Sequence, residues 1–469
     1  MHRAEEKYGR KPVNPGNPVL DWPSLDDFWK VPAMFPTRSI LVCVSILALA
    51  GCGERAQLPL EAGFGSDPQL PEPTQTLLPT VNIAPARGWE NGQMPQPADG
   101  LAVAPFASDL DHPRWIYVLP NGDVLVAESN APANPPSGGI VGAIERNVMT
   151  RAGARTPSAD RITLLRDADG DGVVELRTAF LEGLHSPFGM ALVEGTLYVA
   201  NTDAVVAFPY ETGQTQITAA GETLTALPAG EVNRHWTKNL IASPDGEHLY
   251  VAIGSNSNVA EAGLEIEEGR AAIWQIDRAT GEHRIFGSGL RNPVGMDWEP
   301  VSGELWTAVN ERDELGSDLV PDYMTSVEAG DFFGWPWSYY GDRVDTRVEP
   351  ARPDMVARAI RPDYALGAHT ASLGLSFAQD SGLGPDWESG AYIGQHGSWN
   401  RNPHSGYKVI YIPFENGDPA GDPVDVLAGF LDEDGNALGR PVGVTFDQTG
   451  ALLVADDVGN IIWRVTRDE

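Results

Sequence analysis

One pattern of apolar and polar positions recurs along this chain. Its clearest copy begins at Leu110-Asp-His112 and runs through Gly122 to Ala127. Each copy consists of a hydrophobic run, a turn that contains glycine and a second run rich in Val, Tyr and Leu, which is typical of a β-hairpin. Five weaker copies begin near the following residues: Leu184, His235, Leu290, His369 and Gly439.

The spacing of the copies predicts the fold. They recur roughly every 50 to 80 residues, which leaves room for outer strands and loops around each hairpin. A strand-rich repeat of that size is typical of propeller blades, and six copies predict an all-β, six-bladed β-propeller. Although 469 residues would ordinarily suggest several domains, a repeat architecture of this kind forms a single unit.

A polar side chain with a charge or a ring opens every copy. A lone histidine at a strand end is usually structural, but six such residues in one register favour a common site. If the inner strands converge on one axis, these side chains converge as well and form a concave polar pocket. The residues are the following: His112, His185, His235, Arg291, His369 and Arg440.

Composition and missing motifs narrow the function. The chain has 32 Lys and Arg against 65 Asp and Glu, a formal charge of −33, which argues against nucleic acid as a partner. The sequence contains no dinucleotide-binding glycine motif, no phosphate-binding loop, no nucleophile elbow and no His-Glu-x-x-His zinc motif. Nicotinamide and nucleotide chemistry are therefore not indicated.

The N-terminal region predicts export and lipid attachment. Both cysteines lie in the apolar stretch 40–52, which is too short to span a bilayer and is typical of a signal peptide. Leu49-Ala-Gly-Cys52 resembles a bacterial lipobox, which implies cleavage before Cys52 and acylation of its thiol. The alternative is a plain signal peptide with an incidental cysteine. Met34 precedes a conventional signal, so we expect the true start there.

These features divide the chain into three parts. Residues 1–51 are predicted to be an upstream extension and lipoprotein signal, 52–100 a Pro-rich tether, and 101–469 the propeller. The expected location is the bacterial cell envelope, facing the periplasm. The propeller itself has no cysteine and therefore no disulfide or thiol chemistry.

An acidic loop between two predicted strands suits a hard cation. Asp167, Asp169 and Asp171 alternate with residues that allow a tight turn, and the Val173 carbonyl and Glu175 are further candidate ligands. Calcium takes six to eight oxygen ligands, so the spacing predicts a structural calcium site. The alternative is a solvated acidic turn, because Thr178 stands where a twelve-residue calcium loop ends in an acid.

Two further stretches are candidate parts of a binding site. The aromatic segment 332–340 either walls a pocket for a flat ring or packs between blades. His396 and Arg401 follow a predicted strand, and together with Arg291, Arg440 and Lys408 they predict a cationic wall for carboxylates. Ion pairs within the propeller are the alternative for these basic residues.

The ordered set of motifs resembles a known family, the pyrroloquinoline-quinone-dependent glucose/sorbosone dehydrogenases, and within it the L-sorbosone dehydrogenase-like lipoproteins. The resemblance extends roughly from residue 63 to residue 465. Its most specific parts are the following: His112-Pro-Arg-Trp, Gly289-Leu-Arg-Asn-Pro-Val-Gly295, Gly334-Trp-Pro336, His396-Gly-Ser-Trp-Asn-Arg401 and Gly439-Arg-Pro-Val-Gly443.

The resemblance implies a quinoprotein oxidoreductase that oxidises a sugar, sugar aldehyde or alcohol by hydride transfer to pyrroloquinoline quinone (PQQ), with calcium bridging cofactor and protein. It assigns the general base to His235 and a charge-stabilising role to Arg291, with PQQ contacts from Asn292 and Arg440. The remaining cofactor-binding candidates are the following: His112, His369, His396 and Arg401. The expected partners are a small sugar or alcohol, a respiratory electron acceptor and the membrane, reached through the lipid anchor.

The chain departs from the family pattern at two places. Gly254-Ser255-Asn256 stands where related sugar dehydrogenases carry an Asp after the second strand of the histidine blade, so His235 has no assured acidic partner. The Gly-Pro step that helps to hold calcium is not evident near Glu311-Arg-Asp-Glu314. Both departures put cofactor binding in question.

Two other functional classes compete with the dehydrogenase. Six-bladed propellers include calcium-dependent lactonases, whose axial metal is held by Glu, Asn and Asp side chains, and non-catalytic propellers that bind carbohydrates or other ligands. The axial register of this chain contains His and Arg rather than acids and amides. This composition favours an anionic cofactor over a bare catalytic calcium ion.

Overall fold

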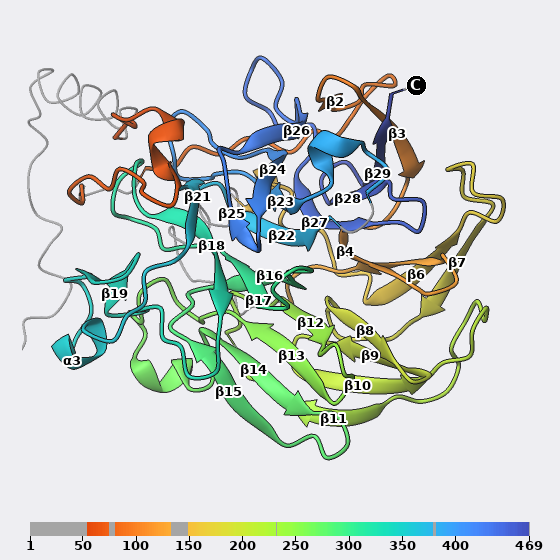
Figure 1. The fold of residues 1–469 in the computed structure, drawn as a ribbon, viewed down its shortest axis with the longest axis horizontal. Helices are drawn as coiled ribbons and strands as arrows, with labels where there is room; N and C mark the ends of the chain where they lie inside the picture. The colour runs from red at the N-terminus through yellow and green to blue at the C-terminus, as the bar shows by residue number, and fades with distance from the viewer. Residues whose placement is uncertain (1–53, 75–79, 133–148, 231, 379–380, 469) are drawn as a thin grey trace, which may run out of the picture. The chain divides into compact units, whose positions relative to one another are not determined.

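The computed structural model describes residues 54–74, 80–132, 149–230, 232–378 and 381–468, which lie in one compact unit. Six of the sheets in this unit are blades arranged around a common axis, so the predicted all-β, six-bladed propeller is confirmed (Figure 1). Cys43, Cys52 and Met34 lie outside the described residues. Within the described ranges, no helix is both long enough and apolar enough to cross a bilayer.

Each blade begins with its innermost strand, and the strands then follow outward. Blade 1 contains β4 (Pro113–Val118), β5 (Val124–Glu128), β6 (Arg161–Arg166) and β7 (Leu176–Leu181). Blade 2 contains β8 (Met190–Val193), β9 (Thr196–Ala200), β10 (Ala204–Pro209) and β11 (Glu222–Ala226). Blade 3 contains β12 (Lys238–Ala242), β13 (His248–Ile253), β14 (Ala272–Asp277) and β15 (His283–Ser288).

The other three blades borrow their outermost strand from the N-terminal part of the chain. Blade 4 contains β16 (Pro293–Trp298), β17 (Leu305–Val309), β18 (Pro321–Val327), β21 (Tyr364–Ala368) and β1 (Phe64–Gly65). Blade 5 contains β22 (Ser372–Phe377), β23 (Gly390–Gln395), β24 (Lys408–Glu415), β26 (Val424–Ala428) and β2 (Gln96–Pro97), and β25 (Asp418–Pro419) also pairs with β24. Blade 6 contains β27 (Pro441–Phe446), β28 (Leu452–Asp456), β29 (Ile461–Arg467) and β3 (Leu101–Ala107).

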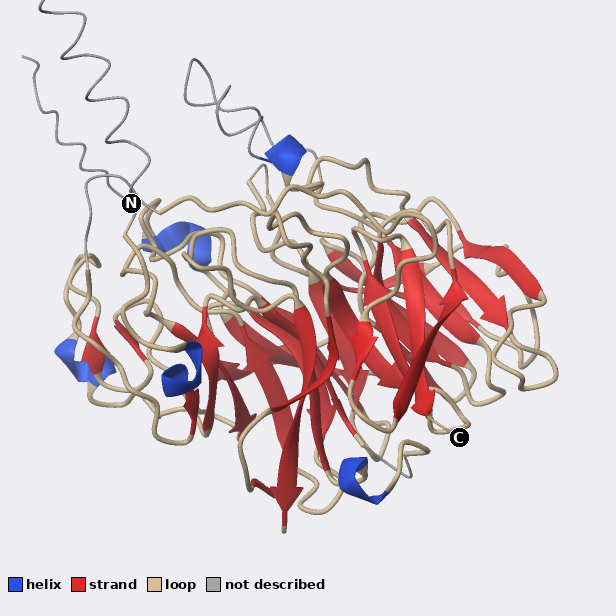
Figure 2. Cartoon of the chain, turned by 90° about the horizontal axis from the view of Figure 1, so that it is seen from above, coloured by secondary structure: helices blue, strands red, loops and turns tan. Residues whose placement is uncertain are grey.

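Short elements lie between the blade strands. A hairpin of β19 (Ser338–Tyr339) and β20 (Arg343–Val344) and the one-turn helix α3 (Pro353–Val356) belong to an insertion in blade 4, between β18 and β21. Three short 3-10 helices complete the described elements: η2 (Leu60–Gly63), η3 (Leu264–Glu267) and η4 (Pro385–Trp387). Seen from the side, the strands form one thick layer beneath the longer loops (Figure 2).

The Pro-x-Gly step of the repeat allows the inner strands to approach each other closely. A Cβ atom at Gly189 would overlap with the backbone nitrogen of Leu240, and one at Gly295 would overlap with the backbone nitrogen of Leu375. Only glycine permits this backbone contact between neighbouring blades. Large apolar side chains fill the space between adjacent sheets farther out, as where Trp306 of blade 4 packs against Phe377 and Phe414 of blade 5.

The described part of the segment predicted to be a tether packs against the propeller. Besides β1 and β2, it contains Ala84, which is fully buried, and Trp89, whose ring packs against Phe430 and Trp463. The Trp89 indole N–H donates a hydrogen bond to Asp456 at 2.7 Å. These residues contribute to the wall of the propeller, while the domain boundary at residue 100 stays a prediction.

Candidate active site

The topology gathers polar side chains at one end of the axis. The inner strand of each blade begins at the same end at which the antiparallel second strand finishes. We call this end the mouth face. His235 and Arg291 precede the inner strands β12 and β16, whereas Asp313 and Asp457 follow the second strands β17 and β28. Residues far apart in sequence therefore meet in two clusters at this end.

His235 is held as a neutral base. Its Nδ1 lies 2.6 Å from the carbonyl oxygen of Ser255 and 3.1 Å from the Ser255 hydroxyl. Because a carbonyl only accepts, Nδ1 carries the proton and Nε2 keeps its lone pair. No described residue forms a hydrogen bond with Nε2, and the side chain is partly exposed. Burial and then the charge of Arg291 lower the pKa of His235 to about 3, so the imidazole is neutral at physiological pH.

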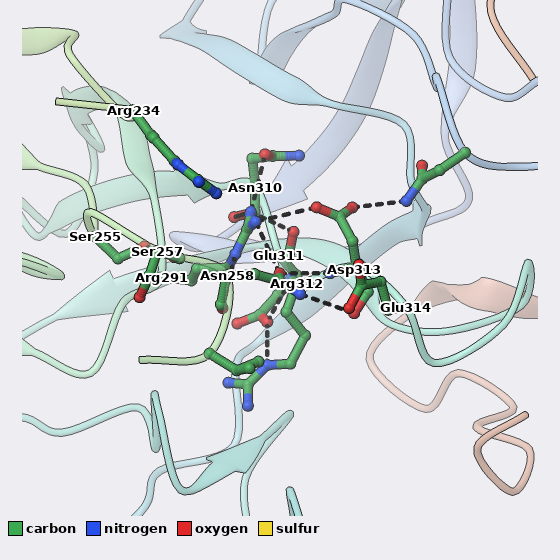
Figure 3. A network of polar contacts seen from close by, with 12 residues as sticks. Arg234, Ser255, Ser257, Asn258, Arg291, Asn310, Glu311, Arg312, Asp313 and Glu314 are labelled. Carbon is green, nitrogen blue, oxygen red and sulfur yellow. Dashed lines mark hydrogen bonds and ion pairs between the residues drawn. The ribbon is translucent and has the colours of Figure 1, made fainter. Parts of the chain in front are cut away.

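Arg291 lies in a cradle of oxygen atoms (Figure 3). Its Nη1 donates to the Glu311 carbonyl at 2.6 Å, and its Nη2 donates to the Asn258 side-chain oxygen at 3.0 Å and to the Asp313 carboxylate at 3.1 Å. Longer contacts of 3.4 Å reach the Asn258 and Asn310 carbonyls. A guanidinium held by this many acceptors is fixed in orientation, which suits a charge-stabilising role.

Asp313 connects Arg291 to the next blade. Its carboxylate also accepts from the Asn400 amide at 2.8 Å and lies 3.6 Å from Nδ1 of His369. Burial by itself would raise the pKa of Asp313, but Arg291, His369 and Asn400 outweigh it and hold that pKa at about 2. His369 donates from Nε2 to the Gly316 carbonyl at 2.9 Å, and although burial opposes it, Asp313 raises the pKa of His369.

Asn292 contributes an unsatisfied acceptor beside His235. The Asn292 side-chain oxygen is buried and has no hydrogen-bond partner among the described residues. A Cβ atom at Gly254 would overlap with that oxygen and would lie 2.6 Å from Cβ of His235. Gly254 therefore allows the Asn292 amide and the histidine to lie side by side, and the free oxygen is available to a ligand.

A second cluster surrounds Asp457 in blade 6. The Asp457 carboxylate forms an ion pair with Arg114 and a hydrogen bond of 2.9 Å with Nε2 of His396, and His112 lies 3.6 Å away. Burial lowers the pKa of His396 to about 4 and also lowers that of His112, despite the carboxylate. Both imidazoles are neutral at pH 7, so the cluster has an anion and a guanidinium at its centre.

Three other predicted residues have different surroundings. The Arg440 guanidinium donates to the Ala84 carbonyl at 3.0 Å and stacks over Tyr407, and its Nε has no partner among the described residues. Arg401 donates to the Ser317 and Pro403 carbonyls, so its guanidinium is not directed at either cluster. His185, expected on the axis, is half exposed and paired with Asp203.

The acidic loop and the aromatic stretch lie outside both clusters. The Asp167, Asp169, Asp171 and Glu175 carboxylates lie close enough together to bind one ion, and calcium binding there stays a prediction. The Val173 side chain is exposed. The aromatic residues of segment 332–340 are mostly buried in contact with blade 4, which agrees with the packing interpretation.

Sequence reasoning missed the carboxylates at the centre of both clusters. Asp313 and Asp457 were not among the candidates, and neither were Asn258, Asn400 and Arg114. A usable signal existed, because a polar residue follows the second strand of the relevant copies just as a basic residue precedes the first. The sequence did indicate that His235 lacks an acidic partner, and the Ser255 carbonyl fills that position.

Comparison with known families decides the classification. A family model described as TrAA12-like matches residues 159–328 and 348–468, more than half of the chain. This chain belongs to the TrAA12-like family. The match includes His235, Arg291 and Asp313 of the first cluster and Asp457 of the second.

Several curated relatives of this TrAA12-like protein are named as sugar dehydrogenases, and two others are named only as uncharacterized proteins. It is 24% identical to the PQQ-dependent pyranose dehydrogenase of Coprinopsis cinerea over 67% of the chain, but it spans only 44% of that protein. It is 22% identical to the PQQ-dependent sugar dehydrogenase of Hypocrea jecorina, over 77% of this chain and 87% of that one. A solved structure, the PQQ domain of pyranose dehydrogenase from Coprinopsis cinerea, matches with a TM-score of 0.65 and 21% identity, covering 82% of this chain and all of that one.

Proposed function

We propose that this protein is a PQQ-dependent dehydrogenase that oxidises a sugar, sugar aldehyde or alcohol at the mouth face, as the resemblance to sorbosone dehydrogenases also implies. One observation carries the proposal. A neutral histidine with its Nε2 lone pair free lies beside a fixed guanidinium, which is the pair that alcohol oxidation requires. The names of the relatives agree with it.

The residues present fit the quinone. PQQ, when bound, supplies an electrophilic carbonyl carbon that takes two electrons from the substrate carbon, and its three carboxylates require cationic partners. Within the described ranges, Nε of Arg114 and Nε of Arg440 are buried donors without a partner, and the side-chain oxygen of Asn292 is a buried acceptor without a partner. Arg440, Arg114 and Asn292 would therefore hold the cofactor, with His112, His396 and His369 in the surrounding wall and Arg401 behind it.

The protein side chains divide the chemical work between them. His235 accepts the hydroxyl proton of the substrate at Nε2, because its Nδ1 proton is fixed on the Ser255 carbonyl. Arg291 presents positive charge without reorganisation, because Asp313, Asn258 and the Glu311 carbonyl already orient it. Its charge also keeps His235 deprotonated and ready to act.

In the part of the chain that the structure describes, the loop after β17 does not offer a calcium ion a free set of ligands. The Glu311 carbonyl and the Asp313 carboxylate, which would be its ligands, accept hydrogen bonds from Arg291. No step is therefore assigned to an axial metal. The same pairing disfavours a calcium-dependent lactonase, which needs acidic and amide ligands free on the axis.

The cellular context follows from the N-terminal sequence. We infer that the mature protein is anchored to the bacterial envelope by acyl chains on Cys52, faces the periplasm and passes electrons to a respiratory acceptor. The sorbosone subtype and the choice of sugar belong to this proposal.

The decisive experiment is reconstitution. The purified chain from residue 53 onward, incubated with PQQ with and without calcium, is assayed for dye reduction with sorbosone, aldoses and simple alcohols. Quinone-dependent oxidation of a sugar or alcohol is the expected result. Binding of PQQ or sugar without turnover would instead make the protein a non-catalytic binding propeller, and lactone hydrolysis would make it a hydrolase.

A further inference from the structure

The insertion between β18 and β21 of blade 4 reaches the candidate site through its buried face. It covers residues 328–363 and contains the β19–β20 hairpin and α3. Its aromatic residues Phe333, Trp335 and Tyr340 are almost completely buried, and Phe333 and Tyr340 belong to the core cluster that includes Met296 and Tyr323 of blade 4. The insertion is therefore packed as part of the blade, which places its polar atoms next to the loop after β17.

Arg312 forms the first connection between the insertion and that loop. Its side chain is fully buried, with 0% exposed. The guanidinium donates to the Pro336 carbonyl at 2.9 Å and to the Ser338 carbonyl at 2.6 Å, both in the insertion. It also pairs with Glu311 at 3.0 Å and with Asp345 at 3.1 Å. Because Pro336, Ser338 and Asp345 all belong to the insertion, the Arg312 guanidinium is directed into the insertion.

Two more residues of the insertion contact the same loop. Arg347 pairs with Asp345 at 2.7 Å and donates to the Asp313 carbonyl at 2.9 Å. The indole N–H of Trp335 donates to the Asn258 carbonyl at 3.0 Å. Asn258 in turn accepts from Arg291 and from the backbone N–H of Asp313 through its side-chain oxygen. The insertion thus contacts both sides of the Arg291 cradle.

The loop between these contacts supplies the partners of Arg291. The Glu311 carbonyl and the Asp313 carboxylate flank the residue whose guanidinium is anchored in the insertion (Figure 3). A shift of Arg312 would therefore move the Glu311 carbonyl and the Asp313 carboxylate together, and these are two of the acceptors of Arg291. We propose that Arg312 is a positioning residue, through which the blade 4 insertion fixes the Arg291–Asp313 pair beside His235.

Physical chemistry explains why arginine is required. A buried guanidinium is tolerated only when its donors are paired, and its planar fork reaches two carbonyls and two carboxylates at once. Lysine keeps the charge but has one compact donor group that cannot make all four contacts. The loop would then lose part of its anchoring, although the blade strands would keep their own hydrogen bonds.

The test compares three variants of the full chain. Arg312→Lys weakens the anchor, and Trp335→Phe keeps an aromatic ring but removes the hydrogen bond to Asn258. Arg343→Lys is the matched control, because Arg343 lies on β20 of the same insertion but outside this network. Thermal melting first establishes which variants fold. The histidine resonances are then titrated by NMR, with His235→Gln assigning the His235 signal.

The proposal makes two measurable predictions. Since Arg291 helps to hold the pKa of His235 near 3, its displacement in Arg312→Lys should raise the His235 midpoint by about one pH unit. The second readout is the rate of quinone-dependent oxidation. For this readout, the positioning role of Arg312 rests on the proposed dehydrogenase function. There kcat should fall roughly 10- to 100-fold in Arg312→Lys and about threefold to tenfold in Trp335→Phe, with KM for the sugar nearly unchanged.

The outcomes separate the two hypotheses. If the parent protein shows no quinone-dependent activity, the proposed function fails, and the titration alone tests the positioning role. A folded Arg312→Lys with the parental His235 midpoint and parental kcat overturns the proposal, as does a variant that loses only melting temperature. If Arg312→Lys does not fold, Trp335→Phe decides by the same criteria.

Discussion

Replacement of His235 by Gln tests the proposed chemistry most directly. The substitution keeps a hydrogen-bonding side chain of similar size but removes the basic nitrogen. Turnover should therefore fall by roughly 10²- to 10⁴-fold, the usual contribution of a general base, while PQQ binding is retained. PQQ retention is measured by titration of the quinone absorbance, which also serves as the folding control.

The pH profile of the parent protein adds a quantitative check. A histidine with the ordinary pKa of 6.5 is only about 3% neutral at pH 5, so kcat/KM would be about 30-fold lower there than at high pH. His235, with a pKa of about 3, is about 99% neutral at pH 5. Activity requires the neutral imidazole of His235. This form is lost only as the pH falls through the pKa of His235 in the folded protein. We expect kcat/KM to be nearly equal at pH 5 and pH 7.

The assay is dye-linked oxidation of the best substrate from pH 4.5 to pH 8, with melting curves at each pH to exclude unfolding. A parental kcat in His235→Gln would refute the role of His235 as base. An acid limb centred near pH 6.5 in the parent would refute the claim that Arg291 and burial keep this histidine neutral.

Three further predictions concern metal binding, stability and attachment. Chelation should lower the melting temperature of the parent, whereas Asp169→Ala should lose this sensitivity, and identical melting with EGTA and with excess calcium would contradict calcium binding in the acidic loop. Asp457→Asn should lower the free energy of unfolding at pH 7 by about 3 to 5 kcal/mol in urea titrations, because Arg114 loses its buried partner. The pKa of Asp457 is depressed, because interactions of its anionic form with His396, His112 and Arg114 outweigh its burial, so this difference should shrink as the pH falls below about 4. Cys52→Ser should release the protein from membranes or block its processing, and unchanged fractionation with unchanged acyl labelling would argue against the lipid anchor.

The repeat made the fold predictable from the sequence. The residues inside the site were harder to predict. The Pro-x-Gly steps at Gly189, Gly295 and Gly443, and Gly374 in the corresponding position, mark inner strands, because these glycines lie where a side chain would meet the neighbouring blade. His235 and Arg291 were recognisable because they open copies of that repeat. Asp313 was harder to single out. Its position after the second strand is a weak local signal, and its importance comes from contacts across blades with His369 and Asn400.

The same limitation applies to the N-terminal segment and to the basic residues. Proline-rich composition predicts a tether, yet Trp89 and Ala84 are buried because Asp456 and Arg440 supply hydrogen-bonding partners from the other end of the chain. Arg401 was expected at the cofactor for its charge, but its guanidinium donates to the Ser317 and Pro403 carbonyls and pairs with Asp318 at 3.6 Å. Charge can be read from a sequence, whereas the direction in which a long side chain points depends on the assembled fold.

Strand β3 pairs with β29, so the outermost strand of the last blade comes from the beginning of the propeller and its partner from the end. The register joins residues separated by most of the chain, from Leu101 opposite Arg467 to Ala107 opposite Ile462. Ring closure therefore carries a high cost in loop-closure entropy, and it cannot form until β29 has been synthesised. Until then β3 is an unpaired edge strand in an open arc of blades. Its free backbone N–H and C=O groups can then pair with a non-native strand. Correct folding of the propeller therefore depends on β29. A deletion within β29 should lower the yield of folded protein more than deletion of a surface loop of the same length.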